Sequence, residues 1–414
     1  MEKDRTILRE LAEKQAEIAR LPVQKTTVEM WRRMNRLEHG KPMVWVREIP
    51  WPELETEEEL QLRTSTPFCR DIESQFLRTF YQWKHIRGDM VVEPKFYCPI
   101  EIKDSGFGLQ IQEQTILQGP GHISSHHYEP VIKEEGDIKK IKTPEVTVDR
   151  EVTERNYQTL QNLFGDILEI EKIGRTGFWL APCDSLAMWW GIQEFLTDLV
   201  IRPEMVHKAL DRLVQAHFEM LRQYEKLNLL SLNNGNSGVG SGGLGFTELL
   251  PQPDFNPNRI RAKDLWGFAT AQIFSEVSPE MHLEFALKYE LRWLERFGLN
   301  YYGCCEQLHR KVEILKQIPN LRRISMSPRA NVEEGASALG DKYIFSYKPN
   351  PAVLATDAWN PEAIRTELRQ TLEILKSHGC ITEIIMKDIS TIRYQPQRLR
   401  EWTQIAVEVS EEFA

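Results

Sequence analysis

The sequence predicts an α/β fold, namely a (β/α)8 barrel (TIM barrel) with an N-terminal helical extension and inserted loops. After residue 150, strand-like and helix-like segments alternate in single file, an order typical of a parallel sheet. The length of 414 residues suits one such barrel with insertions. No glycine fingerprint opens the first strand–helix unit, which disfavours a doubly wound sheet. We therefore expect a single domain over residues 1–414, with residues 1–40 as the extension.

The individual elements follow from hydrophobic spacing and from the residues that end each run. The first 39 residues are predicted to be helical, and Gly40-Lys41-Pro42 ends them before a buried strand, MVWV. Residues 47–100 contain an amphipathic helix, and residues 101–150 alternate short strand-like runs with loops. The later strands are expected at 177–182, 230–234, 299–305, 322–328, 343–349 and 381–389. The later helices are expected at 188–199, 202–227, 278–298, 311–319, 332–340, 361–377 and 396–413.

Composition and charge exclude several classes of protein. The net charge is −9 and the acidic residues are spread along the chain, so there is no basic patch for nucleic acid. The N-terminal stretch is charged throughout, and every apolar run is much shorter than the roughly 20 residues of a membrane span. We expect a cytoplasmic protein. Six cysteines in a chain of this length are no disulfide framework, and clustered ones suggest a metal or catalysis.

Two adjacent cysteines lie in the motif YYGCCEQLH at 301–309, where a predicted strand ends. In a barrel, the residues that follow the strands form the active site. Thiolates and carboxylates are zinc ligands, so Cys304, Cys305 and Glu306 are candidates for a metal site. His309 lies three residues after Glu306 and would share its face of a helix. The alternative is that these are buried small residues with an acid at a helix N-terminus.

Polar residues near aromatic ones mark a possible substrate pocket. Asp264 and Trp266 lie in the run DLWGFA, and Gln272 and Glu276 lie in QIFSE. Asp184 follows the predicted strand 177–182 and is expected to face the barrel mouth. Core packing is the alternative explanation for the aromatic residues, and a helix cap is the alternative for Asp184.

Two loops have less specific compositions. The glycine-rich segment 233–255 lacks the lysine of a phosphate-binding loop, and a flexible lid or a close approach to ligand suits it better. A plain flexible loop is the alternative. The cluster of His122, His126, His127 and Glu129 suggests either metal binding or acid–base chemistry, with solvated loop histidines as the simpler explanation.

Four stretches together resemble the uroporphyrinogen decarboxylase-like superfamily, and within it the corrinoid-dependent methyltransferases. They are MWRRMNRLEHGKPMVWV, IQEFLTDLVIRPEMVHKALDRL, IFSEVSPEMHLEFALKYELRWLERFG, and ILKSHGCITE followed by PQRLREWTQIAVE. The resemblance covers the chain from about residue 27 onward and implies a (β/α)8 barrel. Decarboxylases of the superfamily carry an arginine-rich stretch after the first strand. Here that stretch is REIPWPELE, with only Arg47, so porphyrinogen decarboxylation is disfavoured.

The methyltransferase branch carries a zinc site made of a His-x-Cys and a later cysteine. The resemblance places Cys304 at the first cysteine and Cys380 at the later one, whereas Tyr302 replaces the histidine. Glu306, Cys305 or His309 would then have to complete the ligand set.

The resemblance implies a methyltransferase of the O-demethylase type. It would move a methyl group from a methoxylated substrate, with zinc as Lewis acid, to the Co(I) of a corrinoid. Tryptophans and tyrosines near the expected mouth favour an aromatic substrate. No Asp-x-His-x-x-Gly motif occurs, so we expect the corrinoid (cobalamin) on a separate protein. The sequence leaves open whether the chain forms a homodimer.

The expected roles divide the candidates into two sets. Asp264 and Glu276 would assist protonation, and Trp266, Gln272, Tyr302 and Asp184 would bind substrate. A cofactor-free decarboxylase or lyase that uses Asp184, Asp264 or Glu276 remains an alternative. A non-catalytic binding protein is the other.

Overall fold

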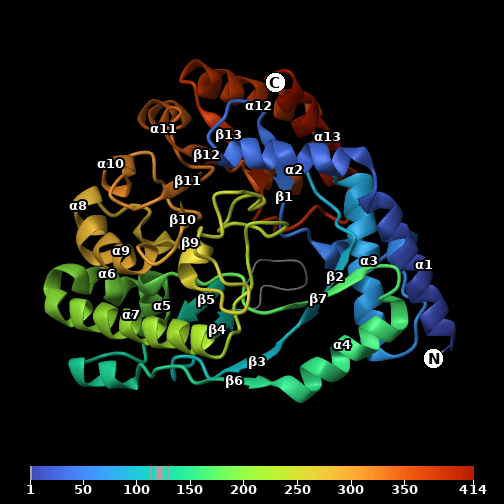
Figure 1. Ribbon diagram of the computed structural model, residues 1–414. Coiled ribbons are helices and arrows are strands. Elements are labelled where there is room, and N and C mark those ends of the chain that lie inside the picture. Colours follow the sequence, from blue (N-terminus) through green and yellow to red (C-terminus); the bar gives the residue numbers. More distant parts are fainter. Residues whose placement is uncertain (1, 112, 117–124, 129) are drawn as a thin grey trace.

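The computed structural model describes residues 2–111, 113–116, 125–128 and 130–414 (Figure 1). At its centre is a seven-stranded parallel sheet with the order β1-β13-β12-β11-β10-β9-β8. Its strands are β1 (Met43–Val46), β8 (Trp179–Leu180), β9 (Trp266–Ala269), β10 (Leu299–Tyr302), β11 (Leu321–Met326), β12 (Ile344–Tyr347) and β13 (Ile381–Met386).

Three two-stranded ladders complete the strands of the described residues. β2 (Lys95–Pro99) pairs with β7 (Glu169–Ile173) in parallel, and β3 (Glu101–Asp104) pairs with β6 (Val146–Asp149) in antiparallel orientation. β4 (Glu113–Ile116) and β5 (Ser125–Tyr128) form the third. Within these residues no ladder joins β8 to β1. The α/β class and the parallel sheet are therefore confirmed, whereas closure into an eight-stranded barrel is not.

The central sheet is nevertheless strongly curved. β10 and β13 are three positions apart in the strand order, which in a flat sheet would separate them by about 14 Å. Yet Lys387, after β13, places its Nζ 3.6 Å from the Sγ of Cys304, after β10. Inside the sheet, the hydroxyl groups of Tyr301 on β10 and Ser346 on β12 are 3.1 Å apart. The sheet thus encloses an interior into which alternate side chains point.

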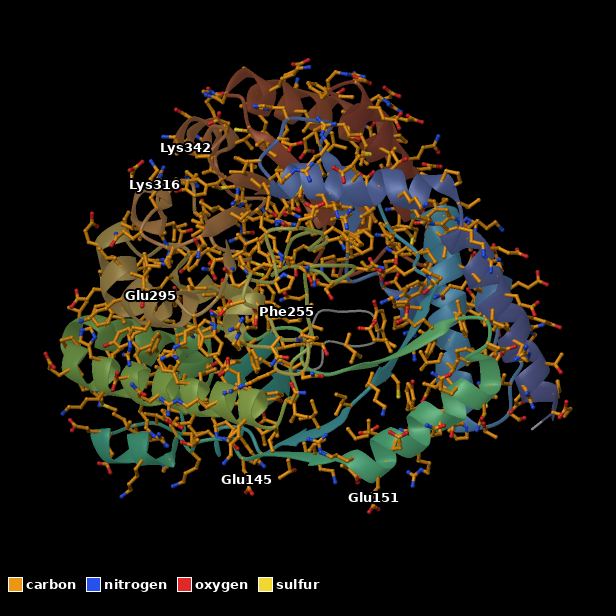
Figure 2. All side chains as sticks on the ribbon, viewed as in Figure 1. Glu145, Glu151, Phe255, Glu295, Lys316 and Lys342 are labelled. Carbon is orange, nitrogen blue, oxygen red and sulfur yellow. The ribbon has the colours of Figure 1, made fainter. Side chains whose placement is uncertain are left out.

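Helices cover the central sheet and the β2–β7 ladder in Figure 1. They are α1 (Glu2–Ala19), α2 (Pro22–Asn35), α3 (Pro67–His85), α4 (Arg150–Phe164), α5 (Pro182–Trp190), α6 (Ile192–Ile201), α7 (Pro203–Lys226), α8 (Pro279–His282), α9 (Lys288–Leu294), α10 (Val312–Leu315), α11 (Val332–Leu339), α12 (Pro361–Ser377) and α13 (Pro396–Glu411). Exposed charges such as Glu145, Glu295 and Lys316 lie at the periphery (Figure 2). None of the described helices is both long and apolar enough to cross a membrane.

Apolar side chains form one large core between the sheet and α5–α13, and a second core beside it. The second core joins α1, α3 and α4 to the β2–β7 pair, with Phe76, Phe96 and Phe164 in ring contact. Two sequence-based expectations were wrong. The helix expected at 188–199 is interrupted at Gly191, and the strand expected at 230–234 is reduced to a bridge between Leu230 and Arg175.

The glycine-rich segment runs through the interior of the curved sheet, and the expectation of a flexible lid was wrong. Its residues 241–247 are buried, and Figure 1 shows the yellow chain before β9 in the middle of the molecule. Asn35 Nδ2 donates to the carbonyl of Phe246 (2.8 Å), and Arg47 Nη1 donates to that of Gly240 (2.5 Å). The Gly243 N–H donates to Glu383 (3.0 Å). The buried part of the segment is therefore an internal plug, defined here as residues 239–247.

We expect Gly243→Ala to destabilise the protein by about 1–3 kcal/mol, because the added methyl overpacks the interior. A Cβ at Gly243 would lie 2.3 Å from the buried ring of Trp31. The free energy of unfolding, measured by urea denaturation, checks this. Gly235→Ala in the same segment is the control, since its Cβ meets nothing within 4 Å. Equal stabilities for the two variants would contradict the close packing of this segment in the interior.

Candidate functional site

Polar side chains gather where the strands of the sheet end. Cys304–Glu306 follows β10, Thr270–Gln272 follows β9, and Lys387-Asp388 follows β13. Asp184 lies in the first turn of α5, directly after β8. The carboxyl ends of parallel strands meet at one edge, and this edge carries the active sites of such folds. We call this edge the rim.

The two cysteines lie on the same side of the chain at the rim. β10 ends at Tyr302, and Gly303 then takes a positive φ of 96°, so the strand alternation that would separate the two side chains is lost. The two Sγ atoms are 3.5 Å apart, and Lys387 Nζ lies 3.6 Å from each. The hydrogen bond between the two sulfurs lowers the pKa of Cys304, and the charge of Lys387 acts in the same direction, whereas burial opposes both. The same bond raises the pKa of Cys305.

Lys387 is balanced by Asp388, which completes this cluster. Lys387 is only 5% exposed, and its ammonium contacts the Asp388 carboxylate. The Cys305 thiol donates to the same carboxylate at 3.4 Å. Asp388 has a φ of 56°, as does Glu48 after β1, and the Asp388 N–H donates to Glu48 Oε2 (2.9 Å). Left-handed backbone at non-glycine residues is held at a cost, and it concentrates at functional sites.

Glu306 holds the cysteine loop in place. Its side chain is fully buried, and Oε2 accepts the Cys304 N–H at 2.7 Å. Oε1 accepts the Thr270 hydroxyl (2.7 Å) and the Ala271 N–H (3.3 Å). Both oxygens are therefore occupied by internal donors, and the carboxylate joins the end of β10 to the end of β9.

Asp184 is a carboxyl group of the rim whose pKa lies near neutral pH. Burial raises its pKa to about 7, and the nearby charge of Glu306 adds to this. The N–H groups of Gln272 (3.0 Å) and Ile273 (2.8 Å) donate to its two oxygens and act in the opposite direction. The group can therefore exchange a proton at neutral pH, and the two N–H groups stabilise the carboxylate that remains.

Tyr302 lies outside the rim, so its expected role in substrate binding was wrong. It points between the sheet and the helices, where its hydroxyl donates to Glu290 Oε2 (2.7 Å) and contacts His282 Nε2 (2.6 Å). Burial raises the pKa of Glu290 to about 8, and burial lowers that of His282 to about 3. Both groups are therefore neutral at pH 7.

Glu290 should make the fold less stable as pH rises. Its pKa is about 8 in the folded chain against a usual 4.5, so between these values only the unfolded chain releases the proton. Each pH unit then removes roughly 1.4 kcal/mol of stability. We expect Glu290→Gln to be more stable than the parent by roughly 4 kcal/mol at pH 8, with the difference vanishing toward pH 4.5. Urea denaturation across this range checks it. Exposed Glu295→Gln is the control, and a pH-independent difference for Glu290→Gln would contradict it.

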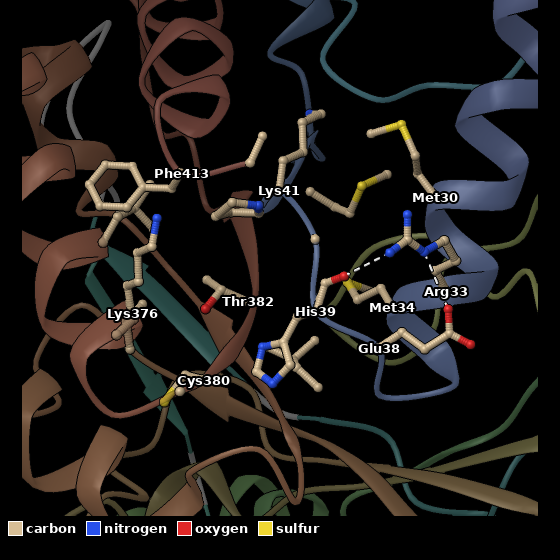
Figure 3. A pocket seen from close by; sticks show the side chains of 18 residues that line it. Met30, Arg33, Met34, Glu38, His39, Lys41, Lys376, Cys380, Thr382 and Phe413 are labelled. Atoms are coloured by element: carbon tan, nitrogen blue, oxygen red, sulfur yellow. Dashed lines mark hydrogen bonds and ion pairs between the residues drawn. The ribbon is translucent and has the colours of Figure 1, made fainter.

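Cys380 does not share the rim with Cys304, as had been expected. It precedes β13, and therefore lies at the opposite end of the parallel sheet from residues that follow the strands. Its thiol contacts the carbonyl of Ala336 (3.6 Å), and burial raises its pKa to about 12. It lines a cavity of about 560 Å³ together with Met30, Lys376 and Phe413 (Figure 3). Because this cavity lies at the amino ends of the strands, we assign it no catalytic role.

Asp264 and Trp266 also lie at the amino end, since they precede and begin β9. Asp264 is fully buried and paired with Arg261, whose Nε donates at 2.9 Å. The Trp266 indole N–H donates to the carbonyl of Gly245 in the plug (3.1 Å). The roles expected for them in protonation and substrate binding were therefore wrong, and both support the fold instead.

The described donor atoms do not fit the zinc site that the resemblance implies. A positive group, the Lys387 ammonium, already lies 3.6 Å from both sulfurs. Both oxygens of Glu306 already accept internal hydrogen bonds, and Cys380 is at the other end of the sheet. In the described part of the chain, no three His, Cys, Asp or Glu side chains form a group that could hold a metal ion. Cys380 therefore does not share a site with Cys304, Cys305 and Glu306, and no step of the reaction proposed below is assigned to zinc.

Of the predicted site residues, the rim brings together Asp184, Gln272, Cys304, Cys305 and Glu306. Glu276 lies beside them, exposed, where it accepts a hydrogen bond from Gln307 (2.5 Å). Within the histidine cluster, His122 and Glu129 lie outside the described residues.

Lys387 and Asp388 were missed. The signal that would have found them is the one that found Cys304, namely polar residues directly after a buried strand.

Comparison with known proteins supports the fold. No protein-family model and no curated protein matches the chain. Among solved structures, a methyltransferase from Methanosarcina mazei is similar, with a TM-score of 0.52 and 10% identity over 92% of this chain and 97% of that one. The two chains share a fold. This supports the α/β fold, and at this identity it carries no site residue across.

Proposed function

We propose that this chain is a methyltransferase that works at the rim. It would take a methyl group from a methoxylated aromatic substrate and pass it to the Co(I) of a corrinoid on a separate protein. The observation that carries the proposal is Asp184, a carboxyl group with a pKa of about 7 at the carboxyl edge of the sheet. The shared fold with a methyltransferase supports the same class of reaction.

The chemistry requires an acid. When a nucleophile takes the methyl carbon, the C–O bond breaks and its electron pair stays on the oxygen, which leaves readily only if it is protonated. Asp184 would supply this proton. Its carboxylate product keeps the N–H groups of Gln272 and Ile273 as donors. The Thr270 hydroxyl, which donates to Glu306, lies at the same edge of the sheet, two residues before Gln272.

A direct assay tests the proposal. The purified chain is mixed with chemically reduced cobalamin and with methoxyarenes, a methylthiol or a methylamine in separate reactions, and methyl–cobalt formation is followed by absorbance. We expect a signal with methoxyarenes that depends on the chain. No methyl–cobalt from any donor would overturn the proposal. Turnover of substrate without cobalamin would instead favour a cofactor-free lyase that uses the same acid.

A further inference from the structure

We propose that Cys304 and Cys305 form a reactive dithiol, in which Cys304 is the nucleophile and Cys305 the resolving thiol, and that a hydroperoxide converts the pair to a vicinal disulfide. The site is a modification site at the rim. It does not depend on the proposed methyl transfer, because it is tested without methyl donor or corrinoid.

Distance and mobility favour closure within the pair. The sulfurs are 3.5 Å apart, against about 2.05 Å in a disulfide, so closure needs a movement of about 1.5 Å. The backbone of Cys304 is held at both ends, because its N–H donates to Glu306 (2.7 Å) and its carbonyl accepts from Ser325 Oγ (2.7 Å). Cys305 is exposed and lies in a bend outside helix and strand. The movement therefore falls on Cys305.

The surrounding charges assign different roles to the two sulfurs. Lys387 Nζ contacts both, while the Asp388 carboxylate accepts a hydrogen bond from the Cys305 thiol only. An ammonium group favours a thiolate, whereas an accepting carboxylate keeps its donor protonated. Cys304 is the sulfur without the carboxylate contact, so it carries the negative charge. Glu306 faces Cys304 with its carboxylate, but that carboxylate is occupied by three internal donors.

The reaction balances in two steps. The Cys304 thiolate attacks one oxygen of the hydroperoxide and breaks the O–O bond, which gives a sulfenic acid and, after one proton is taken up, water or an alcohol. The Cys305 thiol then attacks the Cys304 sulfur, the S–O bond breaks, and water leaves. The pair loses two electrons and the peroxide gains them.

Oxidation and alkylation of the intact chain test this. Protein reduced with a phosphine is treated with hydrogen peroxide, alkylated, digested and analysed by mass spectrometry. We expect the peptide with Cys304 and Cys305 to lose the mass of two hydrogen atoms and to resist alkylation until it is reduced again. Cys69, Cys98, Cys183 and Cys380 should remain as thiols under the same dose. If the pair oxidises no faster than Cys69, or forms only disulfides between chains, the proposal is wrong.

Variants separate the roles. In Cys305→Ser, Cys304 should stop at the sulfenic acid, which dimedone traps. Lys387→Met should slow oxidation at least tenfold, whereas Lys387→Arg should keep most of the rate because it retains the charge. Cys380→Ser is the matched control and should leave the rate unchanged. Far-UV circular dichroism confirms that each variant is folded, and a folded Lys387→Met variant with the parental rate would overturn the role of Lys387.

Discussion

Replacing Glu383 with glutamine is expected to destabilise the fold by about 3–5 kcal/mol, because it leaves a buried guanidinium without its counter-ion. Arg323 and Glu383 are both fully buried, and their nearest atoms are 2.8 Å apart. Burial already lowers the pKa of Arg323, which reflects the cost of its charge in this environment. The free energy of unfolding in urea checks the prediction.

The effect should be large because this pair joins five parts of the fold, namely β11, β12, β13, α2 and the plug. Arg323 on β11 also donates to Asn35 of α2 (2.8 Å) and to the carbonyl of Leu244 in the plug (2.6 Å). Glu383 on β13 accepts the Gly243 N–H and the Ser346 hydroxyl. Loss of one charge therefore weakens the attachment of α2 and of the plug to the sheet.

Two controls distinguish a buried pair from an exposed one. Glu412→Gln breaks the exposed ion pair with Arg369 and should cost no more than about 1 kcal/mol. The double variant Arg323→Met with Glu383→Leu removes both charges, and should recover much of the stability that Glu383→Gln loses. If Glu383→Gln costs no more than Glu412→Gln, the pair does not hold the interior together.

Replacing Asp184 with asparagine should lower the rate of methyl transfer by about 10²–10⁴-fold, the usual contribution of a general acid. The direction of the pH dependence follows from the protonation state of Asp184. With a pKa of about 7, Asp184 is protonated below pH 7 and able to donate, and it loses the proton as pH rises. The parental rate should therefore fall tenfold per pH unit above about pH 7. Single-turnover methyl–cobalt formation between pH 5.5 and about 9 measures it.

Asp211→Asn, which removes an exposed carboxylate paired with Arg292, is the control and should keep the parental rate and profile. In Asp184→Asn the remaining activity should lack the fall above pH 7. If Asp184→Asn retained both the parental rate and the fall in rate above pH 7, another group would be the proton donor.

Local patterns predicted several elements closely. The helix expected at 361–377 is α12 with the same limits, because Asn360 caps it and its apolar residues recur at helical spacing. The strand MVWV is β1. By contrast, β9 was not predicted, since WGFA is short and contains a glycine that weakens a strand pattern.

Part of the rim was also predictable. Cys304, Glu306 and Asp184 were found because each follows a buried strand, and this holds in any parallel sheet. Cys380 was misassigned because it precedes its strand, whereas Lys387 and Asp388 follow the same strand and reach the rim. The direction of a strand therefore decided which of its two ends carries the site.

From the sequence alone come the α/β class, the parallel order of most strands and the strand ends that carry polar residues, since these depend on local spacing and on stop signals. Only the tertiary structure shows that Lys387 lies between two thiols, that Tyr302 faces the helices and that residues 241–247 of the glycine-rich segment are buried. Such contacts join residues far apart in the chain, as with Asn35 and Phe246 of the glycine-rich segment, which are 211 positions apart. They depend on how strongly the sheet curves, which no local pattern encodes.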